Sequence, residues 1–112
     1  MSAVIVLTTL DAATDPAPVA RTLVEERLAA CVNVLPEMQS IYRWRGKVEV
    51  EAERQLVIKT SQDRLVDLQA RLLALHPYEL PEFIVLPVAG GTEAYLTWLR
   101  EQTEPDEGGG GL

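Results

Sequence analysis

The sequence predicts an α+β domain in which strands and helices follow the order β-α-β-β-α-β, with a short helix at the end. Three observations lead to this prediction. Valine or alanine alternates strictly with glutamate over residues 48–53, and this period of two is typical of a strand. Leucines recur at helical spacing over residues 65–75. A turn at residues 45–46 separates two strand-like segments. The order is the split βαβ, or ferredoxin-like, arrangement, an antiparallel four-stranded sheet with two helices on one face.

The first strand is expected at residues 4–7, a continuous apolar run typical of a strand buried on both faces. Residues 8–11 are then expected to lead into a loop. Asp15 and Pro16 begin a helix, because a carboxylate can cap free N–H groups and proline is tolerated in the first turn. The apolar spacing extends this helix over residues 16–29.

The second and third strands are expected to form a long hairpin. Residues 31–35 and 41–44 form the outgoing strand, interrupted by Pro36, which lacks an N–H group and predicts a bulge or a sheet edge. The strand returns over residues 47–59 after the turn. The sequence does not distinguish a two-residue turn from a three-residue turn. A two-residue turn predicts three facing pairs: Tyr42 with Glu49, Ser40 with Glu51, and Met38 with Glu53.

The second helix is expected to begin with a capping box at residues 60–63, in which Asp63 reaches back toward the cap. It ends before Pro77, because proline disfavours helix at the preceding residue. Its buried stripe is expected to comprise Leu65, Leu68, Leu72 and Leu75, widened by Val66 and Leu73.

The remaining segments complete the arrangement. A proline-bracketed connection over residues 76–82 is expected to be rigid and non-helical. The fourth strand is expected at residues 83–88, and the last helix follows a break and cap at residues 90–92.

Composition and charge restrict the function classes. The 112 residues fit one domain over residues 1–103, followed by a flexible acidic and glycine-rich tail at 104–112. The net charge of −7 argues against a nucleic-acid partner. The apolar N-terminus, residues 1–10, is too short to span a membrane and lacks the cationic start of a signal peptide. With Cys31 as the one cysteine, no internal disulfide can form, so a cytoplasmic location is expected.

No strong catalytic signature is present, so we expect a protein that is not an enzyme. Cys31 and His76 are the sole thiol and imidazole, the groups that soft transition metals prefer. Their structural alternatives are a small hydrophobe in a strand and a cap on the last carbonyls of a helix. Lys59 ends a strand beside a helix start, where an anion can bind, or is a surface lysine.

The glutamates of the third strand are a separate candidate for metal. Hard cations prefer carboxylate oxygens, and Glu49, Glu51 and Glu53 share one face of the strand. The soft ligands are too few for a closed zinc site in one chain, so sites shared between copies remain open. The alternative is a strand face that is solvated or ion-paired across copies.

Four segments together resemble the CutA (CutA1) divalent-cation tolerance family: residues 26–33, 42–47, 53–60 and 76–82. The resemblance covers residues 4–100. It implies a ferredoxin-like subunit in a homotrimer similar in architecture to the PII signalling proteins. The chain departs from many relatives in having Leu10-Asp11, in place of a proline-containing turn, after Thr9, and its single cysteine weakens any multi-thiolate copper site.

The resemblance implies a function in the response to metal ions, with binding of a divalent cation such as Cu²⁺ that folding does not require. The metal ligands expected are Cys31, His76 and Glu53. Residues expected in a ligand-binding cleft between subunits are Lys59, Tyr78, Glu79 and Trp44. The alternative is a PII-like sensor that binds a small anionic ligand in an inter-subunit cleft near Lys59.

Overall fold

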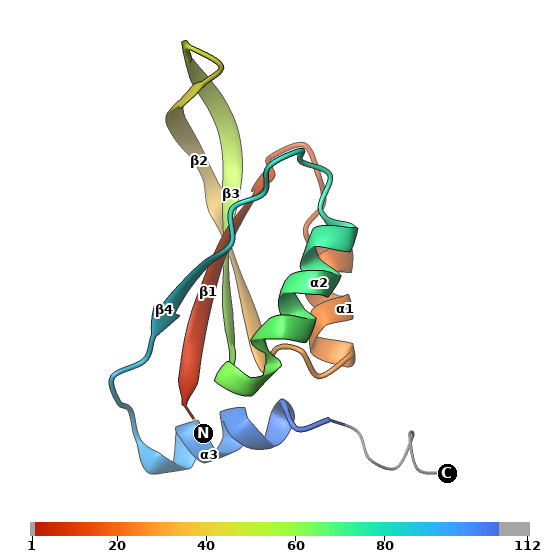
Figure 1. Cartoon of the computed structure of the whole chain (residues 1–112), viewed down its shortest axis with the longest axis vertical. Coiled ribbons are helices and arrows are strands. Elements are labelled where there is room, and N and C mark those ends of the chain that lie inside the picture. Colours follow the sequence, from red (N-terminus) through yellow and green to blue (C-terminus); the bar gives the residue numbers. More distant parts are fainter. Residues whose placement is uncertain (1, 106–112) are drawn as a thin grey trace.

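The computed structural model describes residues 2–105 and contains one four-stranded sheet with the strand order β2-β3-β1-β4 (Figure 1). All three strand pairings are antiparallel, as expected for the ferredoxin-like arrangement. The elements in chain order are β1 (Ala3–Asp11), α1 (Ala17–Glu25), β2 (Cys31–Trp44), β3 (Lys47–Ser61), a 3₁₀ turn (Gln62–Arg64), α2 (Leu65–Leu75), β4 (Ile84–Pro87) and α3 (Glu93–Gln102).

The hydrophobic core lies between the sheet and the two helices α1 and α2, which cover one face (Figure 1). Alternate residues of β1 and β3 point into it, as the period of two requires. Its fully buried members include Val6, Leu10, Leu23, Leu56, Ile58, Leu68 and Leu72. The other face of the sheet, here called the open face, carries the intervening residues Ile5, Leu7, Val57, Ile84 and Leu86. No helix within residues 2–105 is long and apolar enough to cross a membrane.

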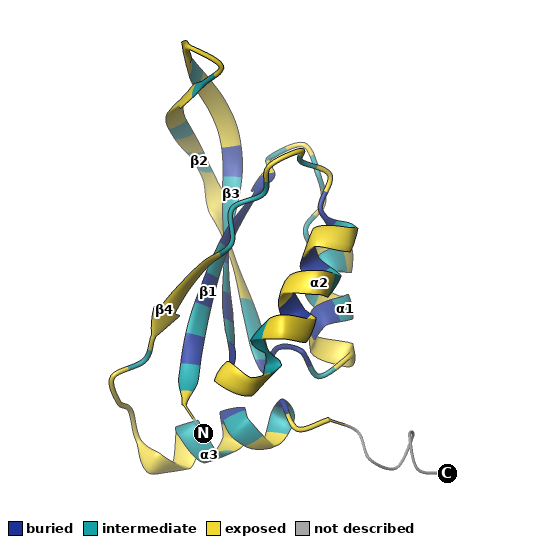
Figure 2. Ribbon diagram, in the orientation of Figure 1, coloured by how far each residue is buried: buried dark blue, intermediate teal, exposed yellow. Residues whose placement is uncertain are grey.

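The β2–β3 hairpin extends well beyond the rest of the sheet. The last strand pair between β1 and β3 joins Asp11 to Glu53, and one further backbone hydrogen bond runs from the Ala12 N–H to the Ala52 carbonyl at 3.0 Å. Within residues 2–105, residues 39–52 otherwise pair only with each other. We call residues 39–52 the arm. It projects away from the helices and is exposed along most of its length (Figures 1 and 2).

The predicted geometry of the hairpin is confirmed. The turn has two residues, and Arg45 and Gly46 both adopt positive φ, 50° and 81°, as a type I′ turn requires. The pairs Tyr42–Glu49, Ser40–Glu51 and Met38–Glu53 all occur, and the register shifts between Val34 and Glu37 around Pro36. Strand β2 lies at the edge of the sheet, where proline is tolerated.

Two predicted boundaries were wrong. The loop expected at residues 8–11 is strand, because these residues pair in register with residues 53–56 of β3. The first helix ends at Glu25, well short of residue 29, because Arg27 adopts a left-handed conformation with φ 60°. At the start of this helix, the Asp15 carboxylate accepts a hydrogen bond from the backbone N–H of Ala17 at 3.0 Å.

The second helix has the predicted leucine stripe, but two details differ. Val66 and Leu73 do not widen the buried stripe, since Val66 is 80% exposed and Leu73 is 43% exposed. The expected capping box is absent at this helix: a 3₁₀ turn precedes α2, and its cap residue Ser61 makes no side-chain capping bond. The hydroxyl of Ser61 bonds to Thr103 instead, at 2.6 Å.

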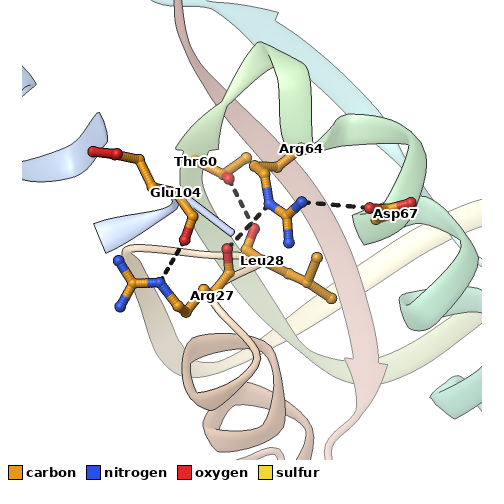
Figure 3. A network of polar contacts seen from close by, with 6 residues as sticks. All are labelled: Arg27, Leu28, Thr60, Arg64, Asp67 and Glu104. Atoms are coloured by element: carbon orange, nitrogen blue, oxygen red, sulfur yellow. Dashed lines mark hydrogen bonds and ion pairs between the residues drawn. The ribbon is translucent and has the colours of Figure 1, made fainter. Parts of the chain in front are cut away.

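Arg27 joins the end of α1 to the end of α3. The backbone N–H groups of Arg27 and Leu28 bond to the carbonyls of Val24 and Leu23, the pattern of a Schellman motif. The Arg27 guanidinium donates to the backbone carbonyl of Glu101, in the last turn of α3. It also donates to the backbone carbonyl of Glu104, just beyond the end of that helix (Figure 3). A cation is favourable there because the last carbonyls of a helix carry partial negative charge.

The chain beyond α3 is described only to residue 105. The break and cap predicted at residues 90–92 are confirmed, since the Thr92 hydroxyl accepts from the Tyr95 N–H at 3.4 Å. The tail predicted at residues 104–112 lies outside the described residues from position 106 onward.

Arg27 provides a test of whether α3 is held by its side chain. Glycine at position 27 removes the left-handed strain, about 1 kcal/mol, but also removes the guanidinium bonds to α3, about 1.5–3 kcal/mol. We therefore expect Arg27→Gly to melt below the wild type, and Arg27→Ala, which keeps the strain, to melt below Arg27→Gly. The melting temperatures are compared at one protein concentration. An Arg27→Gly variant as stable as the wild type would show that the side chain does not hold α3.

Candidate functional site

A buried carboxylate marks the base of the arm. Glu53 is the first residue of β3 that pairs with β1, opposite Asp11, and it also faces Met38 of β2. Its side chain lies on the open-face side, like Val57 and the other odd-numbered residues of β3, and only 7% of it is exposed. A carboxylate is seldom this deeply buried unless it has a partner.

The partner of Glu53 is Tyr78, from the proline-bracketed connection between α2 and β4. The Tyr78 hydroxyl donates to the Glu53 carboxylate at 2.7 Å. Burial raises the pKa of Tyr78 well above its ordinary value, and the hydrogen bond to Glu53 and the negative charges of Glu53 and Asp11 raise it further. Tyr78 is therefore a neutral donor throughout the physiological pH range.

His76 fixes the start of the same connection. Its Nε2 lies 2.8 Å from the Thr9 carbonyl, and its Nδ1 accepts from the Tyr78 backbone N–H at 3.1 Å. Because a carbonyl only accepts and an N–H only donates, His76 is the neutral Nε2–H tautomer. The His76 and Tyr78 rings also meet edge to face with centroids 4.7 Å apart. Both ring nitrogens are thus used in holding the connection against β1.

Gln55 and Glu82 extend this arrangement, and the sequence reasoning missed them. The Gln55 amide donates to the Thr8 carbonyl at 2.6 Å and to the Glu82 carboxylate at 3.2 Å. Gln55 lies two residues from Glu53 on the same face of β3. Glu82 ends the proline-bracketed connection, and its position in that segment was the available signal.

Glu79 and Trp44, predicted in a cleft, lie near the tip of the arm. The Arg45 guanidinium bonds to both carboxylate oxygens of Glu79 at 2.9 Å and also lies over the Trp44 ring, 5.1 Å from its centroid. Both partners of the ion pair are exposed, at 67% and 73% of their side chains. Exposed pairs contribute little stability, so this contact orients the tip more than it stabilises the fold.

Cys31 and Lys59 lie at the other end of β3 from Glu53. They face each other across β2 and β3. The Lys59 ammonium lies over the Tyr95 ring of α3, 5.9 Å from its centroid, and Tyr95 in turn contacts Trp98. The structure therefore brings Glu53, His76 and Tyr78 together, but places Cys31 and Lys59 in a second group.

The donors that the structure describes do not converge into a metal site. Within residues 2–105, no group of three or more histidine, cysteine, aspartate or glutamate side chains is arranged to hold a metal ion. A groove of about 430 Å³ lies between α1 and α2, but it is lined by none of the predicted site residues.

The comparisons with known proteins agree on one family. Residues 4–102 match the family model described as CutA1 divalent ion tolerance protein. The chain is 52% identical over 85 residues to a divalent-cation tolerance protein CutA of Thermus thermophilus, covering 76% of this chain and 82% of that protein. It is 46% identical over 84 residues to a chloroplastic protein CutA of Arabidopsis thaliana, covering 75% of this chain and 46% of that protein.

A solved structure agrees with these matches. The structure of the divalent cation tolerance protein Cut A1 from Thermus thermophilus superposes with a TM-score of 0.87 at 46% identity, covering 91% of this chain and 99% of that one. The α+β fold is therefore that of the CutA1 structures. These comparisons do not support the PII-like sensor that was the alternative prediction.

The Tyr78–Glu53 bond makes a prediction about stability and pH. Tyr78→Phe leaves a buried carboxylate without its donor, so we expect it to lose about 1–3 kcal/mol at pH 7. Because the pKa of Tyr78 is raised in the folded state, its contribution is complete below about pH 10 and is lost as the pH rises further. Wild-type stability should therefore fall more steeply above pH 10 than that of Tyr78→Phe.

The measurement is chemical denaturation at several pH values, with Tyr95→Phe as the control. Tyr95 also loses only a hydroxyl, but its ring lies by Lys59 and Trp98, away from Glu53. Equal stability of Tyr78→Phe and Tyr95→Phe at every pH would contradict the role of the bond.

Proposed function

The chain belongs to the CutA1 divalent ion tolerance family, and from that premise we propose that it is a cytoplasmic homotrimer that binds a divalent cation such as Cu²⁺. It takes part in the response to metal ions by binding rather than by catalysis. The cation is a ligand and is not needed for folding, because one chain already buries a continuous hydrophobic core.

The observation that carries the proposal is the Glu53–Tyr78–His76 chain of hydrogen bonds at the base of the arm. It places a buried carboxylate and an imidazole in one structure, and these are the oxygen and nitrogen donors that Cu²⁺ accepts. His76 must give up one of its two hydrogen bonds to become a ligand. Cys31 lies at the other end of β3, so a site that uses it draws donors from more than one copy.

Free edges and exposed apolar surface support the trimer. Strand β2 and strand β4 are the two edges of the sheet, and the arm has no further partner strand within the described part of the chain. Unpaired edges promote association, and a closed ring of copies satisfies them. The open face supports the same proposal, because it exposes apolar side chains that a second copy would cover, with Ile84 49% and Leu86 42% exposed.

Copper titration by calorimetry tests the metal part of the proposal. We expect Glu53→Gln and the double variant Cys31→Ser/His76→Ala each to weaken Cu²⁺ binding at least about tenfold. Glu49→Gln is the matched control, because it removes an equivalent carboxylate from the same face of the arm, away from Tyr78. Copper binding that is unchanged in both test variants would show that it is adventitious.

Light scattering tests the trimer. The expected mass is about three times the 12.4 kDa of one chain. Trp44→Ala should weaken the trimer by about 2 kcal/mol, since large aromatic side chains dominate interface energies. The readout is the protein concentration at which the trimer dissociates. A stable monomer at micromolar concentration contradicts the trimer, and an unchanged dissociation concentration in Trp44→Ala places Trp44 outside the interface.

A further inference from the structure

The Glu53 carboxylate is buried without a positive charge beside it. Its one hydrogen bond comes from the neutral Tyr78 hydroxyl. Its second oxygen has no hydrogen-bond partner within residues 2–105 but keeps some contact with solvent, since Thr8 Oγ1 is the one fully buried side-chain atom without a partner in those residues. None of the ion pairs among the described residues includes Glu53. Taking a carboxylate out of water without a cation is costly, and the described residues of one chain supply no counter-charge to this site.

The surroundings of Glu53 are also negative. Asp11 lies opposite it, and Glu51 precedes it on the same face of the arm. The pKa of Tyr42 is raised by desolvation and then by the negative charges of Glu51, Glu53 and Glu49. This region therefore attracts a cation.

The opposite face of the arm is apolar and carries one cation near the tip. The register places Ile41 opposite Val50, and Arg43 opposite Val48. Ile41, Val48 and Val50 are 65%, 63% and 56% exposed, although such side chains are usually buried. Arg43 therefore shares one face of the arm with an exposed apolar patch.

Arg43 is a cation without a partner in the described part of its own chain. Arg45 at the same tip pairs with Glu79, but Arg43 makes no ion pair or side-chain hydrogen bond within the described residues 2–105. It cannot reach its own Glu53. The two residues lie on opposite faces, and the five steps of strand from Val48, which pairs with Arg43, to Glu53 span about 17 Å.

We propose that Arg43 of one copy enters the Glu53–Tyr78 site of the next copy, while the apolar face of the arm packs against the open face of that copy's sheet. This inference rests on the homotrimer of the proposed function. In a closed ring each copy gives one arm and receives one, so three identical contacts form.

Arginine suits this position. Its planar guanidinium can bond to the free Glu53 oxygen and present a second N–H to a neighbouring carboxylate, without losing its charge on burial. The apolar patch beside Arg43 supplies the burial that excludes water from the ion pair. The arginine and a divalent cation then compete for the same carboxylate.

Cross-linking between introduced cysteines tests the contact. In a Cys31→Ser background, Arg43→Cys is combined with Glu53→Cys and treated with a short bismaleimide. We expect covalent dimers and trimers on a denaturing gel. The control combines Lys47→Cys with Glu53→Cys, because Lys47 lies at the same tip on the opposite face, and it should give at least about fivefold less cross-linked product.

Light scattering on the same samples separates the two proposals. A trimer that yields only monomers on the gel, or equal yields from the test pair and the control pair, overturns the Arg43 contact and leaves the trimer intact. A monomeric wild-type chain overturns the homotrimer itself.

A double-mutant cycle keeps the test valid if the cysteine pair does not assemble. Arg43→Ala should raise the concentration at which the trimer dissociates at least about tenfold, but by less than about threefold in a Glu53→Gln background. Lys47→Ala should have the same small effect in both backgrounds. Equal effects of Arg43→Ala in the two backgrounds would contradict the contact.

Discussion

The mismatch in length between β1 and the β2–β3 hairpin is the constraint on which the other features depend. Strand β1 stops pairing at Asp11, opposite Glu53, whereas β3 continues from there through the arm to Lys47. Below this point the sheet has helices on one face and a core of its own. In the arm, two strands pair with each other and leave edges that residues 2–105 do not cover. The candidate site lies at the boundary between the helix-covered part of the sheet and the arm.

The connection between α2 and β4 contacts both β1 and β3 at the base of the arm. His76 bonds to β1 through the Thr9 carbonyl, and Tyr78 reaches β3 through Glu53. The prolines that bracket the segment restrict its backbone, so few conformations compete with this one. A connection that contacts both strands can hold a buried carboxylate in place.

Much of the fold could be predicted because its signals are local. The period-two pattern of the hairpin, the leucine stripe of α2 and the Pro36 bulge all express the preferences of neighbouring residues. The end of β1 could not be predicted, because Thr8 and Thr9 become strand through pairing with distant β3. The left-handed conformation of Arg27 could not be predicted from neighbouring residues, because its guanidinium bonds to α3, far along the chain. The site was only partly predictable: His76 and Glu53 carry recognisable chemistry, but the role of Gln55 depends on register.

Amide hydrogen exchange, followed residue by residue over 39–52, tests most directly the central claim that the arm is completed by other copies. In a single chain, alternate amides of the arm face water along both free edges. If other copies cover the arm, these outward amides are protected along with the paired ones, at concentrations where the trimer is intact. Exchange of the outward amides at the rate of an unstructured peptide, in a sample with the mass of a trimer, would contradict the account.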